Sequence, residues 1–190
     1  MGIRDLLSLY KSLLTKQNLS FFRGKTCAID MMVWLYKGMY AMNNNPNVKD
    51  IYLNFPLKML TILTENGIKC IAVFDGNLLP AKLKEIQERI NCKIANEILA
   101  SKLREEGNII QSNVVNNRSL NVTQVHINTL IYLLKKFNFE IIVAPYESDA
   151  QIAYLYHKKL NMSIFVTVIF YDDNAGINHL TLTTLHLEIS

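Results

Sequence analysis

Acidic side chains stand where three short apolar runs end, and their type and spacing indicate a cation site. The runs cover residues 26–29, 70–74 and 141–144. The acids that follow them are Asp30, Asp75, Glu147 and Asp149. A short apolar run that stops at an acid or a turn is typical of an interior strand of a parallel sheet. Because open α/β sheets place ligands beyond the carboxyl ends of their strands, we expect the four acids at one edge of one sheet.

Carboxylates gathered at one edge repel one another unless a divalent cation neutralises them. Their oxygens are hard ligands that suit Mg²⁺ or Mn²⁺, whereas no pair of Cys or His has the spacing of a zinc site. Two such ions about 4 Å apart would activate a water and stabilise the leaving oxygen in phosphodiester hydrolysis. The sequence therefore favours metal-dependent hydrolysis of a phosphodiester.

A purely structural interpretation of the same acids stays open. Asp75 could cap a turn, and Glu147 and Asp149 could complement the N-terminus of a helix. Glu147 and Asp149 are two residues apart, so a regular helix would point them in different directions. They can converge only at an irregular entry to the helix after Pro145.

Basic and aromatic residues near these acids could bind a nucleic acid. Lys82 and Arg89 are seven residues apart, two turns along one helix face, and could contact a phosphate held at the metals. The alternative is a solvated face of a charged helix. Tyr36 could stack on a base, although a core tyrosine is the commoner case. Trp34 is expected in the core.

The elements that position these residues follow from hydrophobic periodicity and turn signals. We expect strands near 25–30, 70–74 and 139–144, with a further strand at 163–170. We expect helices at 4–16, 31–42, 51–66, 81–107, 122–138 and 147–157. Residues 108–121 are predicted as an irregular polar connection, and 171–190 have no clear period. Strands that alternate with helices predict a three-layer α/β domain with a mostly parallel sheet.

Composition is compatible with this architecture. The 190 residues are 50% hydrophobic, which is enough for one sizeable core, and the net charge of +4 permits a polyanionic partner. Two of the three cysteines, Cys27 and Cys70, fall in predicted strands, so reduced core thiols in an intracellular protein are expected. No run reaches the length of a membrane span, and no membrane partner is expected.

Four longer strings carry a resemblance to a known family. They are MGI-x-x-LL at the start, KTCAIDMMVWLYKG, GIKCIAVFDGNLLPAK and VAPYESDAQIAYL. Together they resemble the flap endonuclease/XPG family of structure-specific 5′ nucleases, most closely its eukaryotic exonuclease members. The resemblance covers residues 1–167 and implies a PIN-like 5′ nuclease core with a helical arch at 81–121. Residues 168–190 are expected to be a divergent tail that cannot be assigned to a domain.

The resemblance implies a nuclear DNA-repair enzyme that cleaves DNA at 5′ ends, nicks, gaps or flaps with two Mg²⁺ ions, for which Mn²⁺ could substitute. It assigns the metals to Asp30, Asp75, Glu147 and Asp149 and the scissile phosphate to Lys82 and Arg89. The DNA-binding residues that it implies are Gly2, Tyr36, Lys82, Arg89 and Lys93. It identifies no protein partner.

The chain also departs from the family pattern. Asp5 replaces the usual glycine of the opening motif. The family follows its next strand with Glu-Asp-Ser-Asp, but here Thr167 leads to adjacent acids at Asp172 and Asp173. We therefore expect a truncated chain with an incomplete second metal site and weak or absent cleavage. The alternatives are a DNA-junction-binding module without catalysis and a non-functional translation product.

Overall fold

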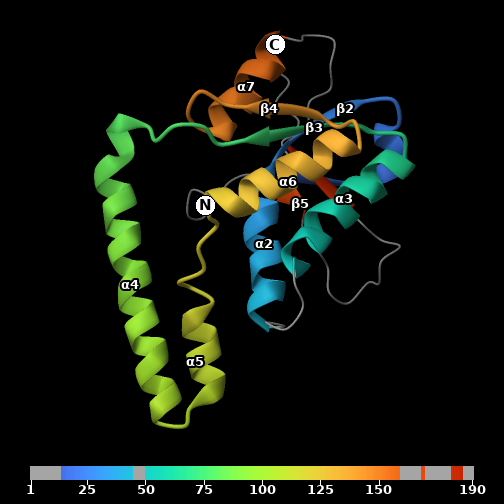
Figure 1. The fold of residues 1–190 in the computed structure, drawn as a ribbon. Coiled ribbons are helices and arrows are strands. Elements are labelled where there is room, and N and C mark those ends of the chain that lie inside the picture. The colour runs from blue at the N-terminus through green and yellow to red at the C-terminus, as the bar shows by residue number, and fades with distance from the viewer. Residues whose placement is uncertain (1–13, 45–49, 159–167, 170–180, 186–190) are drawn as a thin grey trace.

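A parallel sheet of three strands forms the centre of the protein (Figure 1). The computed structural model describes residues 14–44, 50–158, 168–169 and 181–185. Its strands β2 (Thr26–Asp30), β3 (Lys69–Phe74) and β4 (Glu140–Val143) lie in the order β2-β3-β4, with β3 in the middle. Both pairings are parallel, with Asp30 opposite Val73 and Phe74 opposite Val143. The three predicted strands of the parallel sheet are therefore confirmed.

Helices cover both faces of this sheet. On one face lie α2 (Met31–Asn44), α3 (Asn54–Glu65) and α6 (Gln124–Lys136), which share the larger core with the strands. On the other face α7 (Ser148–Lys158) packs through Ile152 and Leu155 on Ala28, Ile71 and Val73. Because both faces are covered, the strands are continuous apolar runs without alternation. The predicted three-layer α/β fold is confirmed.

Local chemistry sets where the helices begin and end. Met32 N–H donates to Asp30 Oδ1 at 2.9 Å, so the last residue of β2 caps the first turn of α2. A short 3-10 turn, Ile51–Leu53, leads into α3, whose first turn holds Pro56. Gly67, with φ of +75°, ends α3 by donating its N–H to Thr64 O at 2.9 Å. Strand β3 begins two residues later.

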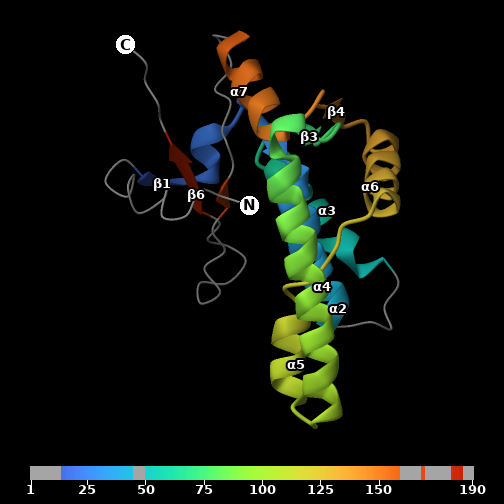
Figure 2. The ribbon, with the colours of Figure 1, turned by 90° about the vertical axis from the view of Figure 1, so that its left-hand side faces the viewer.

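Two helices form an arm that extends away from the sheet (Figures 1 and 2). They are α4 (Leu83–Glu105), which follows a 3-10 turn at Pro80–Lys82, and α5 (Ile109–Asn116). The prediction of an irregular connection at 108–121 is wrong over α5. Asn108 Oδ1 accepts from Gln111 N–H, and the buried Ser112 donates its Oγ–H to Ala100 O at 2.7 Å. The contact with α4 thus stabilises a short helix that the sequence of residues 108–121, with its many Asn and Ser, does not reveal.

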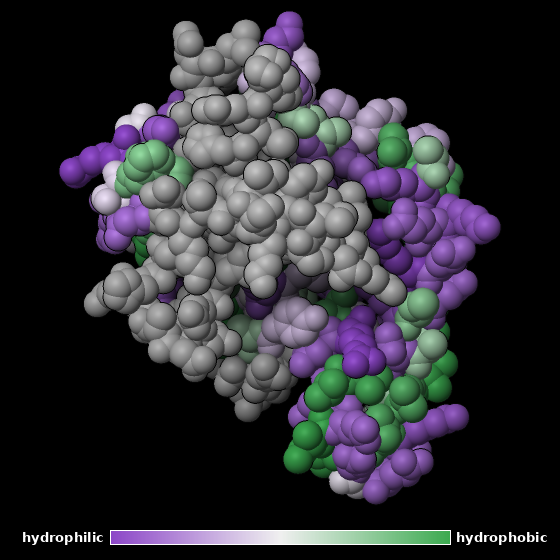
Figure 3. Space-filling view, turned by 180° about the vertical axis from the view of Figure 1, so that it is seen from behind, coloured by the Kyte–Doolittle hydropathy of each residue, from purple (hydrophilic) through white to green (hydrophobic). Residues whose placement is uncertain are grey.

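The arm also exposes an unusual number of apolar side chains. Figure 3 shows them gathered on the arm. Those more than 40% exposed on α4 and α5 are Leu83, Ile90, Ile94, Ile98, Leu99, Ile109, Ile110 and Val114. Within the described segments, no helix is long and apolar enough to cross a membrane.

A second, antiparallel sheet joins distant parts of the chain. In it β6 (Thr181–Leu185) lies between β1 (Leu14–Asn18) and β5 (Val168–Ile169). The helix predicted at 4–16 is wrong at 14–16, which belong to β1, and residues 4–13 lie outside the described residues. The strand predicted at 163–170 is described only at β5, which pairs with β6 and not with the parallel sheet. A short apolar run does not encode its partner strand, so the sequence alone left the pairing of this strand open.

Candidate metal centre

The topology brings the four predicted acids to one edge of the parallel sheet. Asp30 ends β2 and Asp75 directly follows β3, so the two stand at the carboxyl ends of neighbouring strands. Glu147 lies in the irregular segment after β4, and Asp149 is in the first turn of α7. The expected entry geometry after Pro145 is therefore present, because Glu147 precedes the helix and Asp149 is within it.

The Asp30 carboxyl is half-buried near the negative charges of two of the other acids. Burial raises the pKa of the Asp30 carboxyl, and the negative charges of Asp75 and Asp149 raise it further. Hydrogen bonds from Met32 N–H and the Ser148 side chain act in the opposite direction and lower this pKa. A half-buried carboxylate that senses two like charges is an unfavourable arrangement unless a cation or donors offset it.

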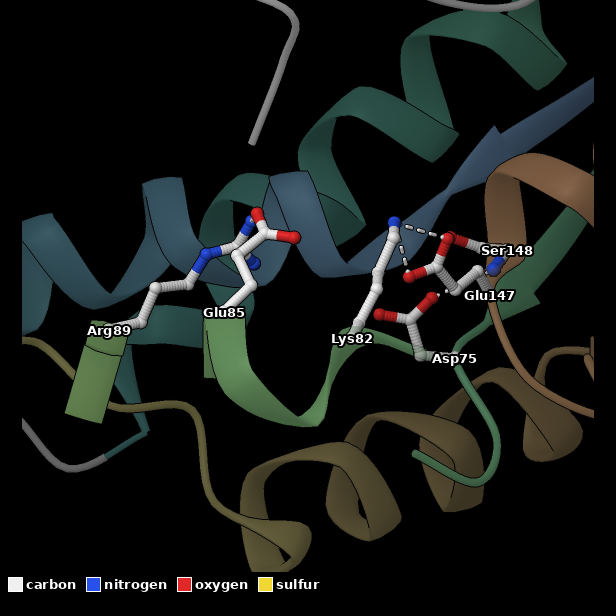
Figure 4. Close-up of polar contacts among 6 residues, drawn as sticks. All are labelled: Asp75, Lys82, Glu85, Arg89, Glu147 and Ser148. Carbon is white, nitrogen blue, oxygen red and sulfur yellow. Dashed lines mark hydrogen bonds and ion pairs between the residues drawn. The ribbon is translucent and has the colours of Figure 1, made fainter. Parts of the chain in front are cut away.

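Asp75 also has the structural role that the alternative interpretation assigned to it. Its Oδ1 accepts a hydrogen bond from Ser148 N–H at 2.8 Å (Figure 4). Asp75, which follows β3, thus caps the N-terminus of α7, which follows β4. This bond fastens the end of β3 to the start of α7. A carboxylate has about four lone-pair sites, so capping one N–H does not prevent Asp75 from binding a cation as well.

Lys82 forms an ion pair with Glu147. Its Nζ lies 2.7 Å from both carboxylate oxygens of Glu147, and the two side chains are about 40% exposed. This hydrogen bond raises the pKa of Lys82. Arg89 instead pairs with Glu85 on its own helix, away from Glu147 (Figure 4). The structure thus brings Lys82 to the acids and leaves Arg89 apart from them.

The acids suit a divalent cation chemically, but they do not form a finished cage. Among the described residues, no three His, Cys, Asp or Glu side chains are close enough to hold one ion. The hard oxygens and mutual repulsion of Asp30, Asp75 and Asp149 fit Mg²⁺ or Mn²⁺. Glu147 could join them only after releasing Lys82. A bound ion would therefore compete directly with the Lys82 ammonium group.

A second cluster links the arm to the body of the fold. The Nζ of Lys93 lies 5.6 Å from the centroid of the Tyr36 ring and 3.2 Å from Asn121 Oδ1. Tyr36 is half-buried on α2, whereas Trp34 is 1% exposed and belongs to the core, as predicted. Gly2 lies outside the described residues.

Sequence reasoning missed two residues of these clusters. The buried Ser148 contacts two acids, and its position between Glu147 and Asp149 was a usable signal. Asn121 follows the arm, and no local pattern marks it as a partner of Lys93.

A groove of about 720 Å³ near Lys69 and Glu140 lies at the opposite end of the strands, and none of the predicted site residues lines it.

Comparison with known proteins identifies relatives in both sequence and fold. The family described as "XPG N-terminal domain" matches residues 1–96. Exonuclease 1 of Xenopus laevis is 32% identical over 177 residues, which are 92% of this chain and 23% of that protein. Exodeoxyribonuclease 1 of Schizosaccharomyces pombe is 35% identical over 158 residues, 82% of this chain and 28% of the relative. The chain thus spans about a quarter of the length of these relatives.

Solved structures support the fold. The catalytic core of Rad2 in complex with DNA substrate has a TM-score of 0.67 at 20% identity, covering 96% of this chain and 53% of that one. Flap endonuclease-1 from Methanococcus jannaschii has a TM-score of 0.51 at 22% identity, covering 87% of this chain and 54% of that one. At such identities the likeness concerns the fold alone.

Proposed function

The chain belongs to the family defined by the XPG N-terminal domain, and from this premise we propose that it is a 5′ nuclease that hydrolyses phosphodiester bonds in DNA. The observation that supports the proposal is that Asp30, Asp75, Glu147 and Asp149, which follow three separate strands, lie at the same edge of the sheet. The named relatives, an exonuclease and an exodeoxyribonuclease, agree in the type of bond cleaved.

In this proposal the four acids hold Mg²⁺, with Mn²⁺ as a substitute. When bound, the metal supplies an activated water and stabilises the leaving oxygen. Lys82, once released from Glu147, can turn its ammonium group to a phosphate oxygen of the substrate. Arg89 must likewise exchange Glu85 for phosphate. Both side chains already pair with a carboxylate, so binding DNA would replace that carboxylate by a phosphate in each case.

The substrate in this proposal is DNA with a 5′ end, as at a nick, a gap or a flap. Tyr36 offers a ring on which a terminal base can stack, and Lys93 beside it offers a positive charge to the backbone. Gly2 completes the set implied by the family resemblance. A role in DNA repair would place the protein in the nucleus.

A second candidate is a DNA-junction-binding module that does not cleave. The ion pair between Lys82 and Glu147 favours it, because this contact neutralises Glu147 without a metal. The acids after Thr167 also favour it, since Asp172 and Asp173 are adjacent and lack the spacing of the family's second set. We therefore expect slow turnover from this chain, with DNA binding retained.

A cleavage assay separates the two candidates. The 190-residue chain is incubated with a 5′-labelled nicked or flapped duplex in Mg²⁺ or in EDTA, beside Asp75→Ala and Arg89→Ala variants. The nuclease proposal predicts a labelled product only with Mg²⁺, and none from Asp75→Ala. Binding that is equal with and without Mg²⁺, weakened by Arg89→Ala and never followed by cleavage, would establish the binding module instead.

A further inference from the structure

The segments that carry the acids are joined by their backbones. Residues 75–77 follow β3 and residues 144–148 follow β4, and we call this pair of segments the loop junction. Gly76 N–H donates to Tyr146 O at 2.6 Å, and Asn77 N–H donates to Pro145 O at 3.1 Å. Ala144 N–H donates to Phe74 O at 2.9 Å at the end of the strand pair. The hydrogen-bonded pairing of β3 and β4 thus continues beyond both strands.

The close approach depends on the absence of a side chain at Gly76. A Cβ atom built there would lie 1.8 Å from Ala144 O and 2.9 Å from Pro145 O. Both are backbone atoms of the neighbouring segment, so no rotamer change can relieve the contact. Any other residue at this position must push the two segments of the loop junction apart.

The loop junction contains Asp75 and Glu147, and Asp149 directly follows it, so its closure sets the spacing of these three acids. Asp75 directly precedes Gly76, and Glu147 directly follows Tyr146, whose carbonyl oxygen Gly76 binds. The bond from Ser148 N–H to Asp75 Oδ1, at 2.8 Å, spans the same two segments. If the segments separate, this bond lengthens and Asp75 moves away from both Glu147 and α7.

We propose that Gly76 is a positioning residue, which holds the Asp75 carboxylate in register with Glu147 and Asp149 by keeping the loop junction closed. This inference rests on the proposed metal-binding role of those acids and adds the device that sets their spacing. Gly76 itself touches neither substrate nor metal. Its effect is transmitted through backbone hydrogen bonds to the carboxylates.

Gly38 provides a matched control. A Cβ at Gly38 would lie 1.9 Å from Tyr52 O, an equally severe backbone contact, but this contact is between α2 and the 3-10 turn before α3. We expect Gly76→Ala and Gly38→Ala both to lower the melting temperature. Calorimetric titration with Ca²⁺ as the probe ion should show affinity weakened about 10- to 100-fold in Gly76→Ala only, the range for supporting residues of metal sites.

Hydrogen exchange in the unsubstituted protein gives a test that needs neither a metal nor a folded variant. The amides of Gly76, Asn77 and Ser148 should exchange slowly and together, because one closed junction protects all three. Fast exchange of the Gly76 and Ser148 amides would overturn the proposal, as would a folded Gly76→Ala variant with unchanged Ca²⁺ affinity. If the unsubstituted protein binds no Ca²⁺ but protects these amides, the metal proposal fails and the positioning of Asp75 by Gly76 stands.

Discussion

Helix α7 carries Asp149 of the acidic site and packs on the sheet through a small hydrophobic cluster, so truncating Ile152 should release it. Among the described residues, Ile152 and Leu155 of α7 form a small cluster with Ala28, Ile71 and Val73 of the sheet, and the partly buried Ile142 packs against it. Ile152 is 2% exposed. Ile152→Ala removes three carbons from this small cluster.

The expected size of the effect follows from this burial. Truncating a buried isoleucine to alanine lowers the free energy of unfolding by about 2–5 kcal/mol, including the cavity that remains. For a protein of this size, each kcal/mol corresponds to about 2–4 °C in melting temperature. If the substitution destabilises α7 alone, a decrease of about 3 kcal/mol in the free energy of opening this helix would speed hydrogen exchange of its amides by roughly a hundredfold.

Leu134→Ala is the matched control for this prediction. Leu134 on α6 is also fully buried, but it lies in the larger core on the opposite face of the sheet. Both variants should lose similar global stability in urea unfolding. Only Ile152→Ala should show selectively faster exchange in residues 148–158, together with weaker Ca²⁺ binding. Equal exchange profiles in the two variants would refute the idea that α7 opens as a separate unit.

Further predictions concern the thiols and the arm. Exposed Cys92 should react with iodoacetamide at pH 8, whereas Cys70 should not, because burial raises its pKa to about 12 and covers the sulfur; rapid labelling of Cys70 in the folded protein would contradict this. Ser112→Ala removes the hydrogen bond to Ala100 O and should lower stability by about 0.5–1.5 kcal/mol, as measured by urea unfolding, and make α5 more sensitive to protease. Lys93→Met keeps the aliphatic stem but removes the contacts to Tyr36 and Asn121, so proteolysis of α4 should become faster; an unchanged rate would show that these contacts do not hold the arm.

Much of the sheet could be predicted from sequence because its strands are buried on both faces. A parallel strand that is covered on both faces needs apolar side chains on both of them. The strands that end at Asp30 and Phe74 therefore contain continuous apolar runs, without the alternation of a half-exposed strand. The position of the acids followed from the same logic. Once the strands are parallel and adjacent, whatever follows them must meet at one edge.

What the sequence could not show depends on tertiary contacts. Helix α5 packs on α4 with Ser112 and Val115 buried, and the eight residues of α5 are too short a segment to reveal this partner. Spacing alone also says little about ion pairs on α4: Lys84 and Glu88, and likewise Lys93 and Glu97, are four residues apart, yet neither pair is among the salt bridges of the described residues. The contact of Lys82 with Glu147 joins residues 65 positions apart, and no local pattern encodes it.

The most direct test of the central claim is Mn²⁺ binding followed by electron paramagnetic resonance. The account predicts that the unsubstituted chain removes Mn²⁺ from the free-ion signal, that Mg²⁺ restores this signal by competition, and that an Asp30→Asn, Asp75→Asn double variant binds far less Mn²⁺. A free-ion spectrum of equal amplitude with the unsubstituted chain, the double variant and buffer alone would contradict the account, because the acids would then share an edge of the sheet without holding a cation.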